Sequence, residues 1–205
     1  MGKQYSIQFT NNSTNEWNAC VFQQDQQINN PGIMSLAWFA ELCNPNTKCT
    51  FTWTLDYSFV WSETGMLVPG VTFGASEVLP VSSLASGNQV TLDNNGAFLF
   101  SNQATCTPGG SLYISQTNNI PLNMGSVGIG MSGAGTFVVQ AQPNIDLTFT
   151  PHPEYWMAFG QYTTGQVLNT QEMTNTVQVT FPPNIYTMYV TLDAGNNWTV
   201  SQFPG

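Results

Sequence analysis

The chain has 205 residues, of which only 6% are charged, and two lysines without any arginine against 11 acidic residues give a formal net charge of −9. Nucleic-acid binding and charge-driven attachment to anionic lipid both depend on clustered Lys and Arg, so this composition argues against both kinds of partner. Polarity comes instead from Asn, Gln, Ser and Thr, which make up 76 of the 205 residues and suit hydrogen bonding to sugars or to further copies of the chain.

The sequence begins with a strand pattern. In Tyr5-Ser6-Ile7-Gln8-Phe9 apolar and polar residues alternate, which is typical of a half-buried β-strand. No apolar core of a signal peptide precedes this strand, and no later stretch resembles a transmembrane helix. We therefore expect a protein that is cytoplasmic or exported without a classical signal peptide.

The next segment contains a short helix candidate and a pair of cysteines. "SLAWFAEL" (35–42) and, later, "VLNTQEM" (167–173) are the best helix candidates, and both are short. Cys43 and Cys49 lack the tight spacing of a zinc site. Without a signal peptide the four cysteines are expected to be free thiols, and a Cys43–Cys49 disulfide stays open as an alternative. We predict no metal and no cofactor.

Strand patterns dominate the rest of the chain. Short β-branched and aromatic runs alternate with turn residues, as in "KCTFTWTL" (48–55), "NTVQVTF" (175–181), "YTMYVTL" (186–192) and "NWTVSQF" (197–203). Many short strands with frequent turns predict an all-β fold, an antiparallel β-sandwich with little helix.

Segment 56–65, "DYSFVWSETG", combines aromatic rings with carboxylates. A Tyr57 or Trp61 ring could stack on the apolar face of a pyranose while Asp56 or Glu63 binds its hydroxyls, which would make a sugar site. The alternative is that Trp61 packs in the core and Glu63 lies in a solvated turn.

No charged residue occurs from Asn94 to Ile145, a run of 52 residues. One interpretation is a membrane-inserting hairpin of a pore-forming protein around 125–142, with alternating apolar and polar residues. "GTFVVQAQPN" keeps that alternation for only part of its length, which favours a buried or self-associating sheet.

Within this run, Gly128, Gly130 and Gly133 match the dinucleotide-binding pattern G-x-G-x-x-G. That pattern requires a helix that begins inside it and presents its N-terminus to the phosphates. The following residues, "AGTFVVQAQ", are β-branched and strand-like. Segment 125–137 therefore predicts a strand, a tight glycine turn and a second strand, without a nucleotide.

Segment 152–160, "HPEYWMAFG", holds the single histidine of the chain, a glutamate and several aromatic residues. It faintly resembles the Glu-Tyr-aromatic nucleophile strand of one xylanase family, so a glycoside hydrolase using Glu154 is an alternative function. A retaining glycosidase needs two carboxylates about 5 Å apart. The late acid/base glutamate of that family is missing, and His152, between two prolines, fits a turn.

The chain also repeats itself with a period near 100 residues. "VTLDNNGAFLF" (90–100) corresponds to "VTLDAGNNWTV" (190–200), and each predicts a β-hairpin. "TFTWTLDY" (50–57) corresponds to "TFTPHPEY" (148–155), which matches Asp56-Tyr57 with Glu154-Tyr155. The common order of the matches predicts two pseudo-repeated halves, about 1–103 and 104–205, in one compact unit over 1–205.

Several strings resemble the RhiA-like family, which takes its name from a rhizosphere-expressed protein of rhizobia. They are "SLAWFA", "DYSFVWSETG", "LVPGVTF", "SVGIGMSGAGTFVVQAQPN" and "LTFTPHPEYW". The resemblance implies a soluble microbial protein of about this size, linked in rhizobia to quorum-regulated expression near plant roots. It assigns no catalytic or binding residue.

We therefore predict a non-enzymatic, lectin-like recognition protein that binds neutral polar ligands such as glycans, assembles into a homo-oligomer, or does both, in microbe–host interaction. A pore-forming protein and a glycoside hydrolase stay open as alternatives. No catalytic residue is predicted. The candidate ligand-binding residues are Asp56, Tyr57, Trp61, Glu63, His152, Glu154, Tyr155 and Trp156.

Overall fold

The computed structural model describes residues 3–25 and 32–204, and these residues form strands and turns without any helix. In chain order the strands are β1 (Gln4–Asn11), β2 (Trp17–Gln24), β3 (Met34–Ser35), β4 (Ala37–Cys43), β5 (Thr47–Thr54), β6 (Tyr57–Ser62), β7 (Glu77–Pro80), β8 (Gln89–Asn94), β9 (Phe98–Ala104), β10 (Leu112–Gln116), β11 (Ser126–Met131), β12 (Ala134–Gln140), β13 (Asp146–Phe149), β14 (Glu154–Gly160), β15 (Val177–Val179), β16 (Thr187–Leu192) and β17 (Trp198–Ser201). The all-β prediction is confirmed.

Both helix candidates are wrong. Residues 37–43 form strand β4, whereas residues 167–173 form an isolated bridge and a turn. A short apolar run does not distinguish a buried strand from a helix. Here the neighbouring segments, which are rich in β-branched residues, favour a strand. Among the described residues, no helix is long and apolar enough to cross a membrane.

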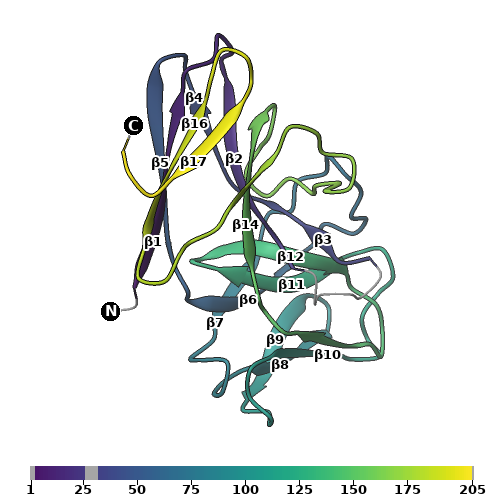
Figure 1. Cartoon of the computed structure of the whole chain (residues 1–205). Helices are drawn as coiled ribbons and strands as arrows, with labels where there is room; N and C mark the ends of the chain where they lie inside the picture. Colours follow the sequence, from purple (N-terminus) through teal and green to yellow (C-terminus); the bar gives the residue numbers. More distant parts are fainter. Residues whose placement is uncertain (1–2, 26–31, 205) are drawn as a thin grey trace.

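The strands form four sheets. Sheet I has the order β17-β16-β1-β5, sheet II β15-β14-β2-β4, sheet III β3-β12-β11-β6-β7 and sheet IV β13-β10-β8-β9. Most neighbouring strands are antiparallel, as expected, but β1 runs parallel to β16, and β8 runs parallel to β10. In Figure 1 the strands of sheet I occupy the upper left, while β8, β9 and β10 lie at the bottom.

Each pair of sheets encloses its own hydrophobic core. Ile7 and Trp53 of sheet I share a buried cluster with Val21 of sheet II. Leu92 of sheet IV shares a second cluster with Ile129 of sheet III. Along β8 and β16 buried and partly exposed residues alternate, which is the pattern of a sheet with one face on a core.

The outer faces of sheets II and III are covered by loops. Leu168 packs with Phe22 and Ala158 on the outer face of sheet II. Phe73 and its neighbours cover the outer face of sheet III in the same way. These strands are therefore apolar on both faces, and the sheets whose outer faces carry no such cluster are I and IV.

The predicted glycine hairpin is confirmed as β11 and β12. Ser132 and Gly133 form its two-residue turn with φ values of 53° and 82°, a conformation that matches the twist of paired strands. A Cβ atom on Gly128 would lie 2.0 Å from the carbonyl oxygen of Phe137 on β12. The bare backbone is thus packed against the neighbouring strand of the same hairpin.

The two sheet pairs share one arrangement. The order β17-β16-β1-β5 in sheet I corresponds to β9-β8-β10-β13 in sheet IV, with the same parallel and antiparallel pairings. The order β15-β14-β2-β4 corresponds to β7-β6-β11-β12 in the same way. Two copies of one unit would give this agreement, while the sequence repeat itself stays a prediction.

Each half of the chain contributes strands to every sheet. In sheet I, β1 and β5 come from the first half and β16 and β17 from the second, and sheets II, III and IV are mixed likewise. The two sheet pairs also touch, because the indole N–H of Trp38 in sheet II donates to the carbonyl oxygen of Met131 at 3.0 Å.

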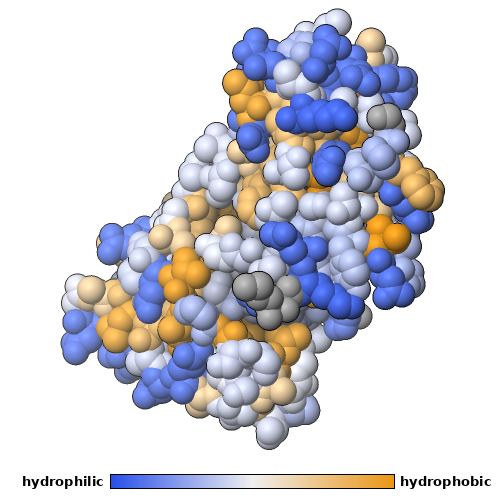
Figure 2. Space-filling model, turned by 90° about the vertical axis from the view of Figure 1, so that its left-hand side faces the viewer, coloured by the Kyte–Doolittle hydropathy of each residue, from blue (hydrophilic) through white to orange (hydrophobic). Residues whose placement is uncertain are grey.

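The surface is built largely from uncharged residues. On the face in Figure 2, separate hydrophobic and hydrophilic clusters interrupt a pale surface of intermediate hydropathy. The most exposed large apolar side chains are Phe203, Leu122 and Met66, which are 74%, 63% and 61% exposed. Single exposed apolar residues are normal, so they do not by themselves mark an interface.

Candidate functional site

Two of the connections that cross between the sheet pairs line one common pocket. Residues 55–56 link β5 of sheet I to β6 of sheet III, and residues 150–153 link β13 of sheet IV to β14 of sheet II. Together with residues of β1 and β15 they enclose about 440 Å³, which is within the usual size range of small-ligand sites. We call this space the junction pocket; it is lined by Tyr5, Leu55, Tyr57, Pro153, Glu154, Tyr155, Gln178, Val179, Thr180 and Phe181.

Aromatic rings form the wall of the junction pocket. The Tyr5 and Phe181 rings meet edge to face with centroids 5.2 Å apart, and Tyr155 meets Phe181 at 5.7 Å in the same manner. Behind them, the ring centroids of Trp53 and Tyr155 are 4.9 Å apart. Such contacts hold each ring in place, so the wall is preorganised for a flat or partly apolar ligand.

The phenols of Tyr57 and Tyr155 keep their protons at neutral pH. Burial raises the pKa of Tyr57 to about 12, and burial likewise raises the pKa of Tyr155 to about 12. Among the residues that line the pocket, Glu154 is the sole carboxylate. The pocket therefore contains hydroxyl and amide groups and one carboxyl group, a composition that suits hydrogen bonding to a polyhydroxylated ligand.

The structure brings together three of the candidate residues, Tyr57, Glu154 and Tyr155. Asp56 is exposed beside them, and its carbonyl oxygen accepts a hydrogen bond from the Ser132 N–H at 2.9 Å. These are the residues that the repeat matched with each other, and both connections reach the same place.

The other four candidate residues lie elsewhere. Trp61 is a core residue, 8% exposed, whose indole N–H donates to a carboxylate oxygen of Glu77 at 2.6 Å. Glu63 is exposed after the end of β6. Trp156 is half-buried in the cluster on the outer face of sheet II. His152 is exposed, and its backbone N–H donates to Asp25 at 2.5 Å.

Sequence reasoning missed Tyr5, Gln178 and Phe181. Their segments were identified as strands, but nothing in a local pattern indicates that the beginning of β1 meets the end of β15. The position of β15 is fixed by the pairing of Val179 with Tyr155 of β14. A local sequence pattern does not reveal such a pairing between two separate strands.

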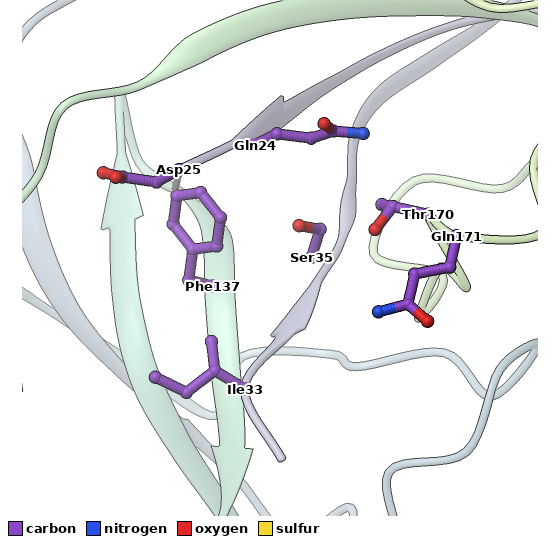
Figure 3. Close-up of a pocket in the computed structure, with 7 residues that line it drawn as sticks. All are labelled: Gln24, Asp25, Ile33, Ser35, Phe137, Thr170 and Gln171. Carbon is purple, nitrogen blue, oxygen red and sulfur yellow. The ribbon is translucent and has the colours of Figure 1, made fainter. Parts of the chain in front are cut away.

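A second pocket, of about 240 Å³, lies beside the start of β3. Figure 3 shows Thr170 and Gln171 on one side of the pocket, whereas the Ser35 hydroxyl and the Asp25 carboxylate point away from them. Ile33 and Phe137 supply its apolar side. It contains none of the candidate residues, but Gln24 pairs with Glu154 across β2 and β14, and Asp25 accepts a hydrogen bond from the backbone N–H of His152.

The cysteines do not form a site. All four are free thiols, so the Cys43–Cys49 disulfide is not formed. Burial, followed by the neighbouring Cys43, raises the pKa of Cys49 to about 12, and burial raises the pKa of Cys20 as well. Within residues 3–25 and 32–204, no three His, Cys, Asp or Glu side chains gather as a metal site would require.

The fold and the pocket define an all-β protein with two sheet pairs and an aromatic pocket at their junction. The sequence model of the RhiA family matches residues 2–203. The chain is also 40% identical to Protein RhiA of Rhizobium leguminosarum bv. viciae over 216 aligned residues, which cover 98% of this chain and 87% of the relative. No solved structure matches it. The chain belongs to the RhiA family.

Proposed function

We propose that the chain is a non-enzymatic recognition protein that binds a neutral glycan in the junction pocket. The observation that carries the proposal is the composition of this pocket: an aromatic wall, two protonated phenols, an amide and one carboxylate within about 440 Å³. Rings contact the apolar face of a sugar, and the polar groups bind its hydroxyls.

The single carboxylate favours binding over hydrolysis. Glycoside hydrolysis requires a pair of carboxylates on the two sides of the scissile bond. Asp56 is next to the pocket but does not line it. A neutral hydroxyl-rich ligand needs no such pair, since hydrogen bonds to Glu154, Gln178 and Tyr57 are sufficient to orient it.

The uncharged hairpin supplies no comparable support for a pore. Every residue of β11 is buried, and β11 pairs with β6 on one side and β12 on the other. Insertion of this hairpin into a membrane would first have to break both ladders.

Glycan-array binding followed by titration calorimetry tests the proposal. We expect the wild-type protein to bind at least one neutral glycan, and Glu154→Gln and Tyr57→Phe each to weaken that binding about fivefold to tenfold, because each removes one polar contact. The proposal includes assembly into a homo-oligomer, and light scattering on the same samples measures the oligomeric state.

Glu63→Gln is the matched control, since it makes the same change in an exposed carboxylate away from the pocket. Its affinity should equal that of the wild type. Absence of binding to every glycan on the array, or release of reducing sugar that Glu154→Gln abolishes, would overturn the proposal.

A further inference from the structure

The outer face of sheet I carries one kind of side chain. Its strands place their hydrophobic residues inward, so every second residue points outward. The outward residues are Gln4, Ser6, Gln8, Thr10, Lys48, Thr50, Thr52, Thr54, Thr187, Tyr189, Thr191, Thr199 and Ser201. All but Lys48 are neutral hydroxyl or amide residues, and no carboxylate is among them, although the chain has 11.

The register aligns these side chains in rows across the four strands. One row runs from Thr199 through Thr191 and Thr10 to Lys48. The next runs from Ser201 through Tyr189 and Gln8 to Thr50. Neighbouring strands lie about 4.8 Å apart and alternate residues about 6.7 Å apart, so the hydroxyls form a regular array.

Toward the end of β1 this face is hollowed into a groove of about 430 Å³, which we call the sheet I groove; it is lined by Gln8, Thr10, Asn12, Lys48, Tyr189, Thr191 and Thr199. Among the described residues, the side chains of Gln8, Thr10, Tyr189 and Thr191 have no hydrogen-bond partner. All four are half-buried. They therefore present unused donors and acceptors to whatever enters the groove.

The corresponding face of sheet IV is different. It also carries hydroxyls, including Thr91 and Tyr113, but it contains the carboxylates of Asp93 and Asp146. The Tyr113 hydroxyl is already used, because it donates to the carbonyl oxygen of Pro108 at 3.1 Å. Sheets I and IV thus share one strand order but differ in the charge of their outer faces. The face of sheet I has no carboxylate, which suits a neutral ligand, whereas the face of sheet IV has two.

We propose that the sheet I groove is a second binding site, for a neutral polysaccharide chain. A polymer with a hydroxyl-bearing unit at each step can contact several positions of the array at once, which raises its affinity without any single strong contact. A second copy of the protein is the poorer fit, because Ser and Thr are depleted where protein interfaces hold their energetic centres. The inference does not rest on the junction pocket.

Affinity electrophoresis of the intact protein tests this inference. The gels contain a mixed-linkage β-glucan, a galactomannan or dextran, and retardation measures binding. We expect at least one polymer to retard the wild type and the double variant Thr10→Val, Thr191→Val to weaken that binding at least about fivefold. Valine keeps the β-branched shape, so the strands should persist; thermal melting confirms the fold.

The matched control is Thr91→Val on sheet IV, which should leave retardation unchanged. Glu154→Gln should leave it unchanged as well. If Glu154→Gln abolishes retardation and the groove variant does not, the polymer binds in the junction pocket and the inference fails while the proposed function survives.

Three other outcomes would overturn the inference. One is that none of the three polymers retards the wild type. Another is that retardation disappears at high salt, which would indicate an ionic contact of Lys48 in place of neutral recognition. The third is that light scattering finds a dimer which the double variant converts to a monomer, since the groove would then hold a second copy of the chain.

Discussion

Asp93 and Asp193 occupy the same place in the two hairpins that the sequence matched. The Asp193 carboxylate accepts hydrogen bonds from the backbone N–H groups of Asn197 and Gly195 at 2.9 and 2.7 Å, and these contacts lower its pKa. The Asp93 carboxylate accepts one from the Thr117 hydroxyl at 2.5 Å, and this contact, the largest cause, lowers the pKa of Asp93. Both carboxylates therefore stabilise the fold more strongly when they are ionised, Asp193 within its own turn and Asp93 by its contact with Thr117.

These two pKa values predict a loss of stability in acid. A carboxyl group whose pKa is lower in the folded state stabilises the fold fully above its ordinary value of 3.8, and that contribution is lost as the pH falls toward the lowered value. We expect the melting temperature to fall below about pH 4, and Asp193→Asn to make that fall smaller.

Thermal melting from about pH 6 to about pH 2 measures this effect. Asn196→Gly is the control, because residue 196 has φ of 59° in the same turn, suits glycine, and has no contact with the carboxylate. If the melting temperature falls as steeply in acid for Asp193→Asn as for the wild type, the Asp193 carboxylate does not cause the loss of stability.

At the scale of elements, the β11–β12 hairpin depends on glycines within a strand. Gly128 and Gly130 lie against β12 so closely that a Cβ atom on Gly130 would be 2.4 Å from the carbonyl oxygen of Ala134. Both contacts are with backbone, which cannot rotate away as a side chain would. The hairpin therefore requires glycine here for space between strands.

Gly128→Ala should destabilise the protein by about 3 kcal/mol, since overpacking against backbone forces the two strands apart. Urea denaturation measures the change in the free energy of unfolding. Gly74→Ala is the control, because a Cβ at Gly74 meets nothing within 4 Å and its effect should stay within about 0.5 kcal/mol. An unchanged transition for Gly128→Ala would show that the strands lie further apart.

Local strand tendency and turn chemistry could be predicted from the sequence, but strand partners could not. The alternation in "YTMYVTL" identifies β16, yet it is silent on the parallel pairing of Thr187 with Ser6. The same limit applies to the residues of the junction pocket. The repeat identified Tyr57 and Glu154 as candidates. Trp61 lies near acidic residues in the sequence, and that pattern is equally consistent with a ring that stacks on a sugar and with a core indole that donates to Glu77.

At the scale of the whole molecule, the halves of the chain are interdependent. Sheets I and II need β1, β2, β4 and β5 from the first half and β14 to β17 from the second. Neither half can complete a core alone, because each core is lined from both.

Fragments 1–106 and 107–205 test this dependence, since the cut falls between β9 and β10. We expect neither fragment alone to unfold cooperatively, because each lacks half of both cores. An equimolar mixture should recover one complex with the circular dichroism of the intact chain. A cooperative transition in fragment 1–106 alone would mean that it folds independently.

The interleaving of the halves also dictates the order of events on the ribosome. Strands β6 to β13 are contiguous, so sheets III and IV, apart from β3, can close while the last strands are still being synthesised. Ser6, in contrast, meets Thr187, 181 residues later. During vectorial synthesis β1, β2, β4 and β5 must wait with open edges, and open edges recruit other strands. The edge of β1 that pairs with β16 therefore stays exposed to unwanted strand pairing until β16 emerges.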